Sequence, residues 1–211
     1  MRTLGLLLLT SVLAAPLSAR ADGGIEIGLG AGIAKPYGQI EGGSNLGDAV
    51  AWGFPLQADV QFRFLKQFAA GAYVRYVPTS LASTLQNGCS NAGISCDASD
   101  LGVGVLGEYR FSDHLEGGPW LGALVGWEML RSTRSESGQK ATENLSGIEG
   151  GVRGGMDFEL GGITLGPWGA FHVAQFTTSK VESNGTTTSG SIASAALHGW
   201  FELGVRLSLL L

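Results

Sequence analysis

The most constraining feature of this 211-residue sequence is an alternation of apolar residues with small or polar ones at a period of two. From Ile25 to Ile33 every second position is apolar, and Glu26 and three glycines fall between. Successive side chains of a β-strand point to opposite faces of a sheet, so this pattern predicts a strand with one apolar face. The same pattern recurs and predicts eight strands, over residues 25–33, 56–64, 70–76, 101–111, 121–129, 148–159, 163–173 and 200–211.

The connections between these segments alternate strictly between short and long. The short ones lie at 66–67, 112–118 and 161–162, and the long polar ones lie near 38–51, 79–99, 133–146 and 179–196. All long connections therefore emerge at one end of the sheet, and both termini lie at the other. This layout predicts an all-β fold, an eight-stranded antiparallel up-and-down transmembrane β-barrel.

Alternation alone does not say which face points inward, because a soluble lipocalin-like barrel also alternates, with its apolar face inside. Here the non-apolar face consists mainly of glycine, carboxylates and arginine, whereas a soluble exterior would use lysine, threonine and serine. The four lysines fall near strand ends, in turns or in loops, and aromatic residues of the apolar face gather near both strand ends, as in interfacial girdles. The interior of an eight-stranded barrel is only wide enough for side chains. These features favour the membrane barrel over the soluble one.

Composition and motifs exclude several function classes. The 35 glycines argue against a helical fold, and a formal net charge of −5 excludes a nucleic-acid binder that relies on phosphate attraction. The G-x-G-x-x-G match at 102–107 lies inside a predicted strand, whereas a dinucleotide site needs a strand-to-helix turn. His114 is expected in a turn, His172 in the lumen beside a carboxylate, and His198 where the last loop enters its strand. The sequence therefore predicts no enzyme, with no catalytic, cofactor-binding or metal-binding residues.

The first 21 residues have the pattern of a cleaved secretory signal peptide. Arg2 supplies the positive charge, residues 4–17 form the apolar stretch, and Ala19 and Ala21 fit the small-x-small cleavage rule. The barrel domain is then expected over 22–211. In an exported chain, Cys89 and Cys96 are expected to form one disulfide in a polar loop. A metal site there would need further ligands, and no histidine lies near the pair in the sequence.

Charged residues on the inward face are the most informative set. Those expected at or above mid-depth in the lumen are Asp59, Arg75, Glu128, Glu149, Arg153, Glu202 and Arg206; a second group lies nearer the short turns, namely Glu26, Arg63, Glu108, Arg110, Asp157 and Glu159. Buried charges must be paired, because an unpaired one costs several kcal/mol. Glu202 lies above Arg206 on the same face of the last strand. The set predicts a structural salt-bridge plug, with an ion path or gate as the alternative.

The chain resembles the small eight-stranded outer-membrane β-barrel proteins of Gram-negative bacteria, the group that includes the OmpA transmembrane domain, OmpX and OmpW. The resemblance covers residues 22–211 and rests on pattern. The final segment, WFELGVRLSLLL, is similar to the strand by which the barrel-assembly machinery recognises such proteins, although it ends in Leu211 where the family commonly ends in Phe. The resemblance implies the bacterial outer membrane as the location, and outer-membrane lipids and the assembly machinery as partners.

Three functions are compatible with this pattern. The first is a non-catalytic structural or surface-interaction protein that displays four extracellular loops, whose ligand the sequence does not identify. The second is a narrow pore or a conduit for a small solute. The third is an enzyme at the outer rim that acts on lipid A or peptides; a fold by itself does not establish such an activity.

Overall fold

The computed structural model describes residues 23–41, 43–64, 66–112, 117–137 and 139–211. The predicted signal peptide lies outside these residues and stays a prediction, as does the expected place of His114. The strands of the wall are β1 (Gly24–Glu41), β3 (Val50–Gly53), β4 (Leu56–Arg63), β5 (Phe68–Leu81), β6 (Ser95–Arg110), β7 (Gly118–Glu136), β8 (Gln139–Glu159), β9 (Ile163–Ser183) and β11 (Leu197–Leu210). The loop end adds β2 (Ser44–Asn45), α2 (Leu46–Ala49), α3 (Ser83–Asn91) and β10 (Thr186–Ser191).

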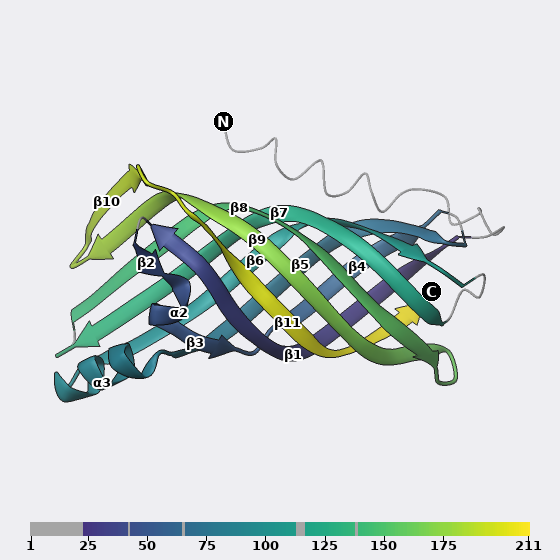
Figure 1. Ribbon diagram of the computed structural model, residues 1–211, viewed down its shortest axis with the longest axis horizontal. Coiled ribbons are helices and arrows are strands. Elements are labelled where there is room, and N and C mark those ends of the chain that lie inside the picture. Colours follow the sequence, from purple (N-terminus) through teal and green to yellow (C-terminus); the bar gives the residue numbers. More distant parts are fainter. Residues whose placement is uncertain (1–22, 42, 65, 113–116, 138) are drawn as a thin grey trace.

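These strands close into a ring. Neighbours pair antiparallel in chain order from β4 to β9, β11 then pairs with β9, and β1 closes the ring between β11 and β4. The short strand β3 occupies the same position in the ring as β4, from which Phe54 and Pro55 separate it, and it pairs with both β1 and β5. Figure 1 shows the tilted wall, with α2, α3 and β10 at one end and the C-terminus at the other. The predicted eight-stranded antiparallel barrel is confirmed.

The wall is apolar outside and charged inside. Outward side chains such as Leu29, Val105 and Phe201 are 51–58% exposed, whereas the inward Arg75 and Glu202 are completely buried. A soluble barrel would have the reverse arrangement, so the lipocalin-like alternative is excluded. No helix in the described parts of the chain is long and apolar enough to cross a membrane.

Aromatic side chains border the apolar wall at both ends. On the turn side, Phe68 packs against Phe64 and Tyr109 at ring-centroid distances of 6.2 and 5.0 Å, and Tyr109 contacts Phe111 at 5.1 Å. On the loop side, Trp52 meets Phe54 edge-on at 4.3 Å. Aromatic rings at both borders are the girdles expected of a transmembrane barrel.

Two of the four segments expected as long loops are largely strand. β7 and β8 continue as a hairpin to the pair Glu136 and Gln139, and β9 continues to Ser183 before turning back as β10. The second turn contains Asn184 and Gly185 at φ values of 49° and 78°, which is the combination that a two-residue hairpin turn requires. Above the membrane both faces of these strands meet water, so neither face is apolar and the period-two signal disappears.

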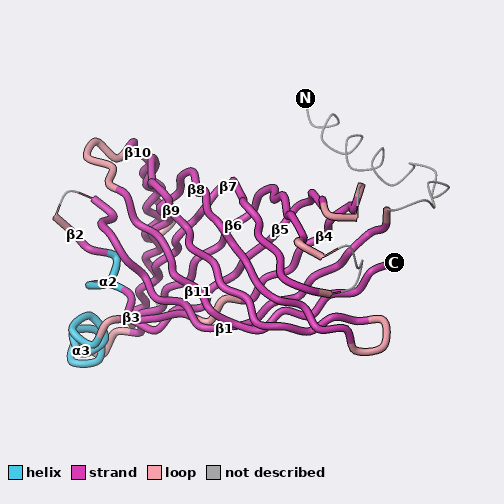
Figure 2. Tube along the Cα trace, turned by 45° about the vertical axis from the view of Figure 1, so that its right-hand side comes forward, coloured by secondary structure: helices cyan, strands magenta, loops and turns pink. Residues whose placement is uncertain are grey.

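The other two long segments contain helices. The stretch 38–51 includes β2 and α2, and the stretch 79–99 includes α3, both at the loop end (Figure 2). The predicted disulfide is present between Cys89 at the end of α3 and Cys96 at the start of β6, with their Cα atoms 6.2 Å apart. It ties the helix to the wall.

The orientation of the wall leads to a first prediction. Leu203→Arg, on the outward face of β11, should destabilise the folded barrel in lipid bilayers by about 2–4 kcal/mol if it lies near the midplane. Ser189→Arg, on β10 beyond the apolar wall, is the control and should change stability little. Urea titration of the folded fraction, read as heat-modifiable gel migration, measures both. Equal effects of the two arginines would contradict the assigned orientation.

Candidate functional site: the charged lumen and its mouth

The lumen holds two clusters of buried ion pairs, and the one nearer the short turns is balanced in charge. This turn-side cluster contains four arginines and four carboxylates: Arg63, Arg110, Arg153, Arg206, Glu26, Asp59, Glu108 and Asp157. Glu26 is its centre, because its carboxylate lies 2.6 Å from Arg63, 2.8 Å from Arg110 and 3.1 Å from Arg206. Arg153 pairs with Glu108, so each of the four arginines has a carboxylate partner within the cluster.

Other contacts of the turn-side cluster link strands that have one strand between them in the wall. Asp59 on β4 accepts a hydrogen bond from Arg206 on β11 at 2.8 Å. The side chain of Arg153 on β8 donates to Glu108 on β6 at 3.0 Å from its Nε. Arg153 and Arg206 both lie over the ring of Trp120, 5.2 Å from its centroid. Ion pairs and a cation–π stack thus fill this part of the lumen.

The cluster nearer the loops has a surplus of carboxylates. Arg75 is its single arginine, and four carboxylates surround it: Asp100 at 2.8 Å, Glu202 at 2.8 Å, Glu149 at 2.9 Å and Glu128 at 3.7 Å. All five side chains are completely excluded from solvent. We call these residues the loop-side cluster. Because four carboxyl groups surround one guanidinium, Arg75 carries most of the electrostatic compensation there.

Other polar groups surround the loop-side cluster. The Tyr73 hydroxyl donates to Glu149 at 2.5 Å, and the Trp200 indole donates to Glu128 at 2.9 Å. His198 lies 2.9 Å from the other oxygen of Glu128. His172 faces the lumen as expected, 3.5 Å from Glu149 and 3.6 Å from Glu202.

The structure distributes the predicted charged residues between the two clusters. Asp59, Arg153 and Arg206 lie in the turn-side cluster, and Arg75, Glu128, Glu149 and Glu202 lie in the loop-side cluster. Glu202 binds Arg75 and not Arg206, because inward side chains reach across the lumen and find partners on other strands. Glu159, expected in the lumen, is exposed at the end of β8.

Asp100 is a buried charged residue of the lumen that the sequence did not predict. It directly precedes the predicted strand 101–111, at the border of the segment expected to be a loop. Asp100 lies two positions before the inward Gly102. If the predicted strand had begun two residues earlier, the alternation would have placed Asp100 on the inward face.

Glycines of the inward face make room for these charges. A Cβ atom at Gly28 would lie 2.6 Å from Arg206 Nη2, and one at Gly102 would lie 2.5 Å from Glu149 Oε1. At these two positions glycine leaves room for the ion pairs, whereas at Gly71 and Gly204 a Cβ would lie 2.0 and 2.1 Å from a backbone oxygen of the neighbouring strand.

This crowding leads to a second prediction. Gly102→Val should destabilise the barrel by about 1–3 kcal/mol, because its side chain would displace Glu149 and Arg75. Gly150→Val is a matched control, since a Cβ there meets only the Leu124 carbonyl oxygen at 3.7 Å. Urea midpoints of the two variants in the same lipid give the comparison, and similar midpoints would show that the lumen has spare room.

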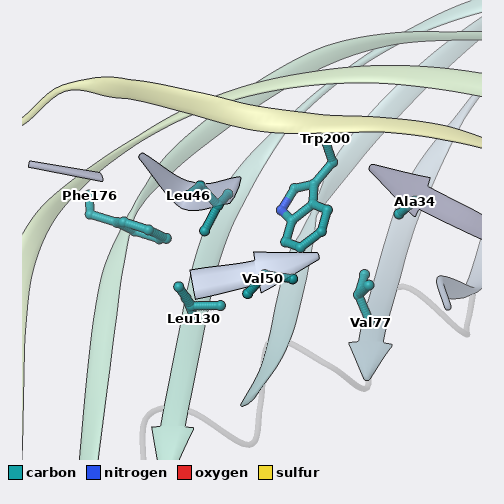
Figure 3. Close-up of a cluster of buried hydrophobic side chains, with 7 residues drawn as sticks. All are labelled: Ala34, Leu46, Val50, Val77, Leu130, Phe176 and Trp200. Carbon is teal, nitrogen blue, oxygen red and sulfur yellow. The ribbon is translucent and has the colours of Figure 1, made fainter. Parts of the chain in front are cut away.

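An apolar cluster, which we call the mouth cluster, closes the mouth above the loop-side cluster. Figure 3 shows its seven buried residues, Ala34, Leu46, Val50, Val77, Leu130, Phe176 and Trp200. Leu46 and Val50 come from the first long segment, which was expected to be a polar loop, and they are 0% and 1% exposed. The Phe176 ring stacks on His198 at 3.9 Å, so the apolar cluster rests directly on the charged one. The first loop thus folds into the barrel and covers its mouth.

No group of three or more histidine, cysteine, aspartate or glutamate side chains within the described residues is arranged to hold a metal ion. The glycine motif 102–107 lies within β6 and continues as strand. His198, the histidine nearest the outer rim, is fully buried under the mouth cluster.

Comparisons with known proteins identify the fold. No family model and no curated protein matches the chain. Among solved structures, Neisserial surface protein A matches with a TM-score of 0.54 and 16% identity, over 88% of this chain and 98% of that one. A major outer membrane protein from Thermus thermophilus gives 0.57 and 12%, over 90% and 100%. Ail, the attachment invasion locus protein of Yersinia pestis, gives 0.52 and 12%, also over 90% and 100%. The chain therefore has the fold of small bacterial outer-membrane β-barrels, and its apolar outer wall agrees with that location.

Proposed function

We propose that the chain is a closed, non-catalytic barrel of the outer membrane that holds a set of structured loops at the cell surface. The observation that supports this role best is the double closure of the lumen. Two layers of buried ion pairs fill the interior, and the first loop seats Leu46 and Val50 in the mouth above them. The barrel then serves as an anchor, and the surface-interaction role belongs to the loops.

Planar-bilayer conductance tests this proposal. The purified barrel should pass little or no current, because a buried ion-pair network leaves no continuous water path. Leu46→Asp should loosen the mouth, and Leu46→Asp combined with Glu26→Gln should raise the current further. A wild type that conducts steadily, with no change in these variants, would favour the alternative of a narrow pore. The surplus of carboxylates in the loop-side cluster is the observation that favours that alternative, since it would select cations.

We also propose two sets of contacts with the cell envelope. Membrane lipids contact the apolar wall, and the barrel-assembly machinery engages the C-terminal strand, here β11. We also propose that residues 1–21 are removed during export. Intact mass measurement of the membrane-inserted protein checks the cleavage, and it should show two fewer hydrogens for the oxidised Cys89–Cys96 pair.

A further inference from the structure

Three of the loops meet in a cleft of about 360 Å³ at the outer end of the barrel. α2 contributes Asp48, β7 contributes Arg134, and the segment of α3 and β6 contributes the rest, namely Thr84, Leu85, Gly88, Cys89, Ile94 and Cys96. Figure 2 shows α2 and α3 together at this end. The volume falls within the range of small-molecule sites.

The residues that line the cleft are partly apolar and include two side chains of opposite charge. Leu85, Ile94 and the disulfide sulfurs supply the apolar surface, and Asp48 and Arg134 supply one carboxylate and one guanidinium. Within the described residues, neither charge belongs to an ion pair, so their charged atoms stand more than 4.0 Å apart. Asp48 accepts a hydrogen bond from Asn45 at 3.1 Å through one oxygen, which leaves its other oxygen for a ligand.

We propose that this cleft binds a small zwitterion with an apolar side chain, of the amino-acid class. Arg134 receives the ligand carboxylate, Asp48 receives the ammonium group, and the apolar side chain lies on Leu85, Ile94 and the disulfide. Both charges are exposed at the rim of the cleft, and a ligand that carries both signs can pair with each of them at once.

A disulfide forms part of the wall of the cleft. The disulfide fixes α3 against the start of β6, and its Cys89 and Cys96 line the cleft themselves. A Cβ atom at Gly88 would meet no atom within 4 Å, so the helix presents open space at this position. The site rests on the proposed surface role of the loops, and it gives that role a ligand class.

Isothermal titration of the intact, oxidised barrel in detergent micelles with L-leucine tests the site. Wild type should bind leucine, and N-acetyl-leucine amide, which has the same side chain without either charge, should bind at least tenfold more weakly. Asp48→Asn and Arg134→Gln should each weaken leucine binding at least tenfold. Absence of leucine binding by wild type, or equal affinity for the uncharged analogue, would overturn the proposal.

A pair of glycine variants separates occupancy of the cleft from general damage. Gly88→Leu should fill the cleft and abolish leucine binding, and it should keep α3 because leucine favours helices more than glycine does. Gly47→Leu in α2 is the matched control, since its Cβ also meets nothing within 4 Å but Gly47 does not line the cleft. Wild-type affinity in Gly88→Leu would contradict the site.

Conductance of the same preparation distinguishes this proposal from the proposed function. A closed barrel that does not bind leucine would overturn the ligand site alone. A conducting barrel that binds leucine would overturn the closed-lumen proposal and leave the site standing.

Discussion

Arg75→Met is expected to destabilise the barrel more than any other single substitution in the lumen. It would leave four buried carboxylates without their shared cation, and removal of one partner from a buried ion pair alone costs about 3–5 kcal/mol. Methionine keeps most of the volume of the arginine chain, so the loss reports charge and hydrogen bonding and not a cavity. The urea midpoint of folded protein in lipid bilayers is the measurement, with heat-modifiable migration as the readout of closure.

Arg75→Lys is the matched control for this experiment. Lysine restores the charge but not the planar fork, in which one terminal nitrogen donates to Glu202 and the other donates to both Asp100 and Glu149. Its stability should lie between those of Arg75→Met and wild type. A methionine variant as stable as wild type would mean that water already compensates the four carboxylates, which would argue for a wet lumen and against the closed barrel.

The alternation of residues was sufficient to predict the barrel, because it is imposed by two different surroundings on the two faces of each strand. It failed where the surroundings become the same. The hairpins that end at Glu136 and Gln139 and at Asn184 and Gly185 lie beyond the apolar wall, where polar residues predominate on both faces and apolar ones such as Leu145 and Val181 are scattered. The Asn-Gly pair was the available sign of the second hairpin, as this dipeptide favours the turn that joins two strands.

The contents of the lumen were predictable as a set of residues but not as pairs. Inward alternation places Arg75 and Glu202 on β5 and β11, and nothing in the sequence says that they meet across the barrel at 2.8 Å. That contact depends on the tilt and stagger of the strands, which fix the height of each residue relative to residues on distant strands. The burial of Leu46 and Val50 was likewise hidden, because isolated apolar residues in a short polar segment carry no period.

Because the two clusters differ in charge balance, the isosteric variants Glu26→Gln and Glu128→Gln are expected to differ in stability. Glu26→Gln should destabilise the barrel by about 3–5 kcal/mol, because Glu26 pairs with Arg63, Arg110 and Arg206 in a cluster that has no carboxylate to spare.

Glu128→Gln should cost far less or even stabilise the barrel, although Glu128 is just as buried. It removes one of four carboxylates from the surroundings of a single arginine, and it stands farthest from that arginine at 3.7 Å. The glutamine oxygen still accepts the hydrogen bond of the Trp200 indole. Urea unfolding of both variants in the same bilayer measures the difference between them. Equal losses would show that hydrogen-bond geometry outweighs net charge in this lumen. A smaller loss for Glu128→Gln would show that repulsion among the carboxylates of the loop-side cluster destabilises the barrel.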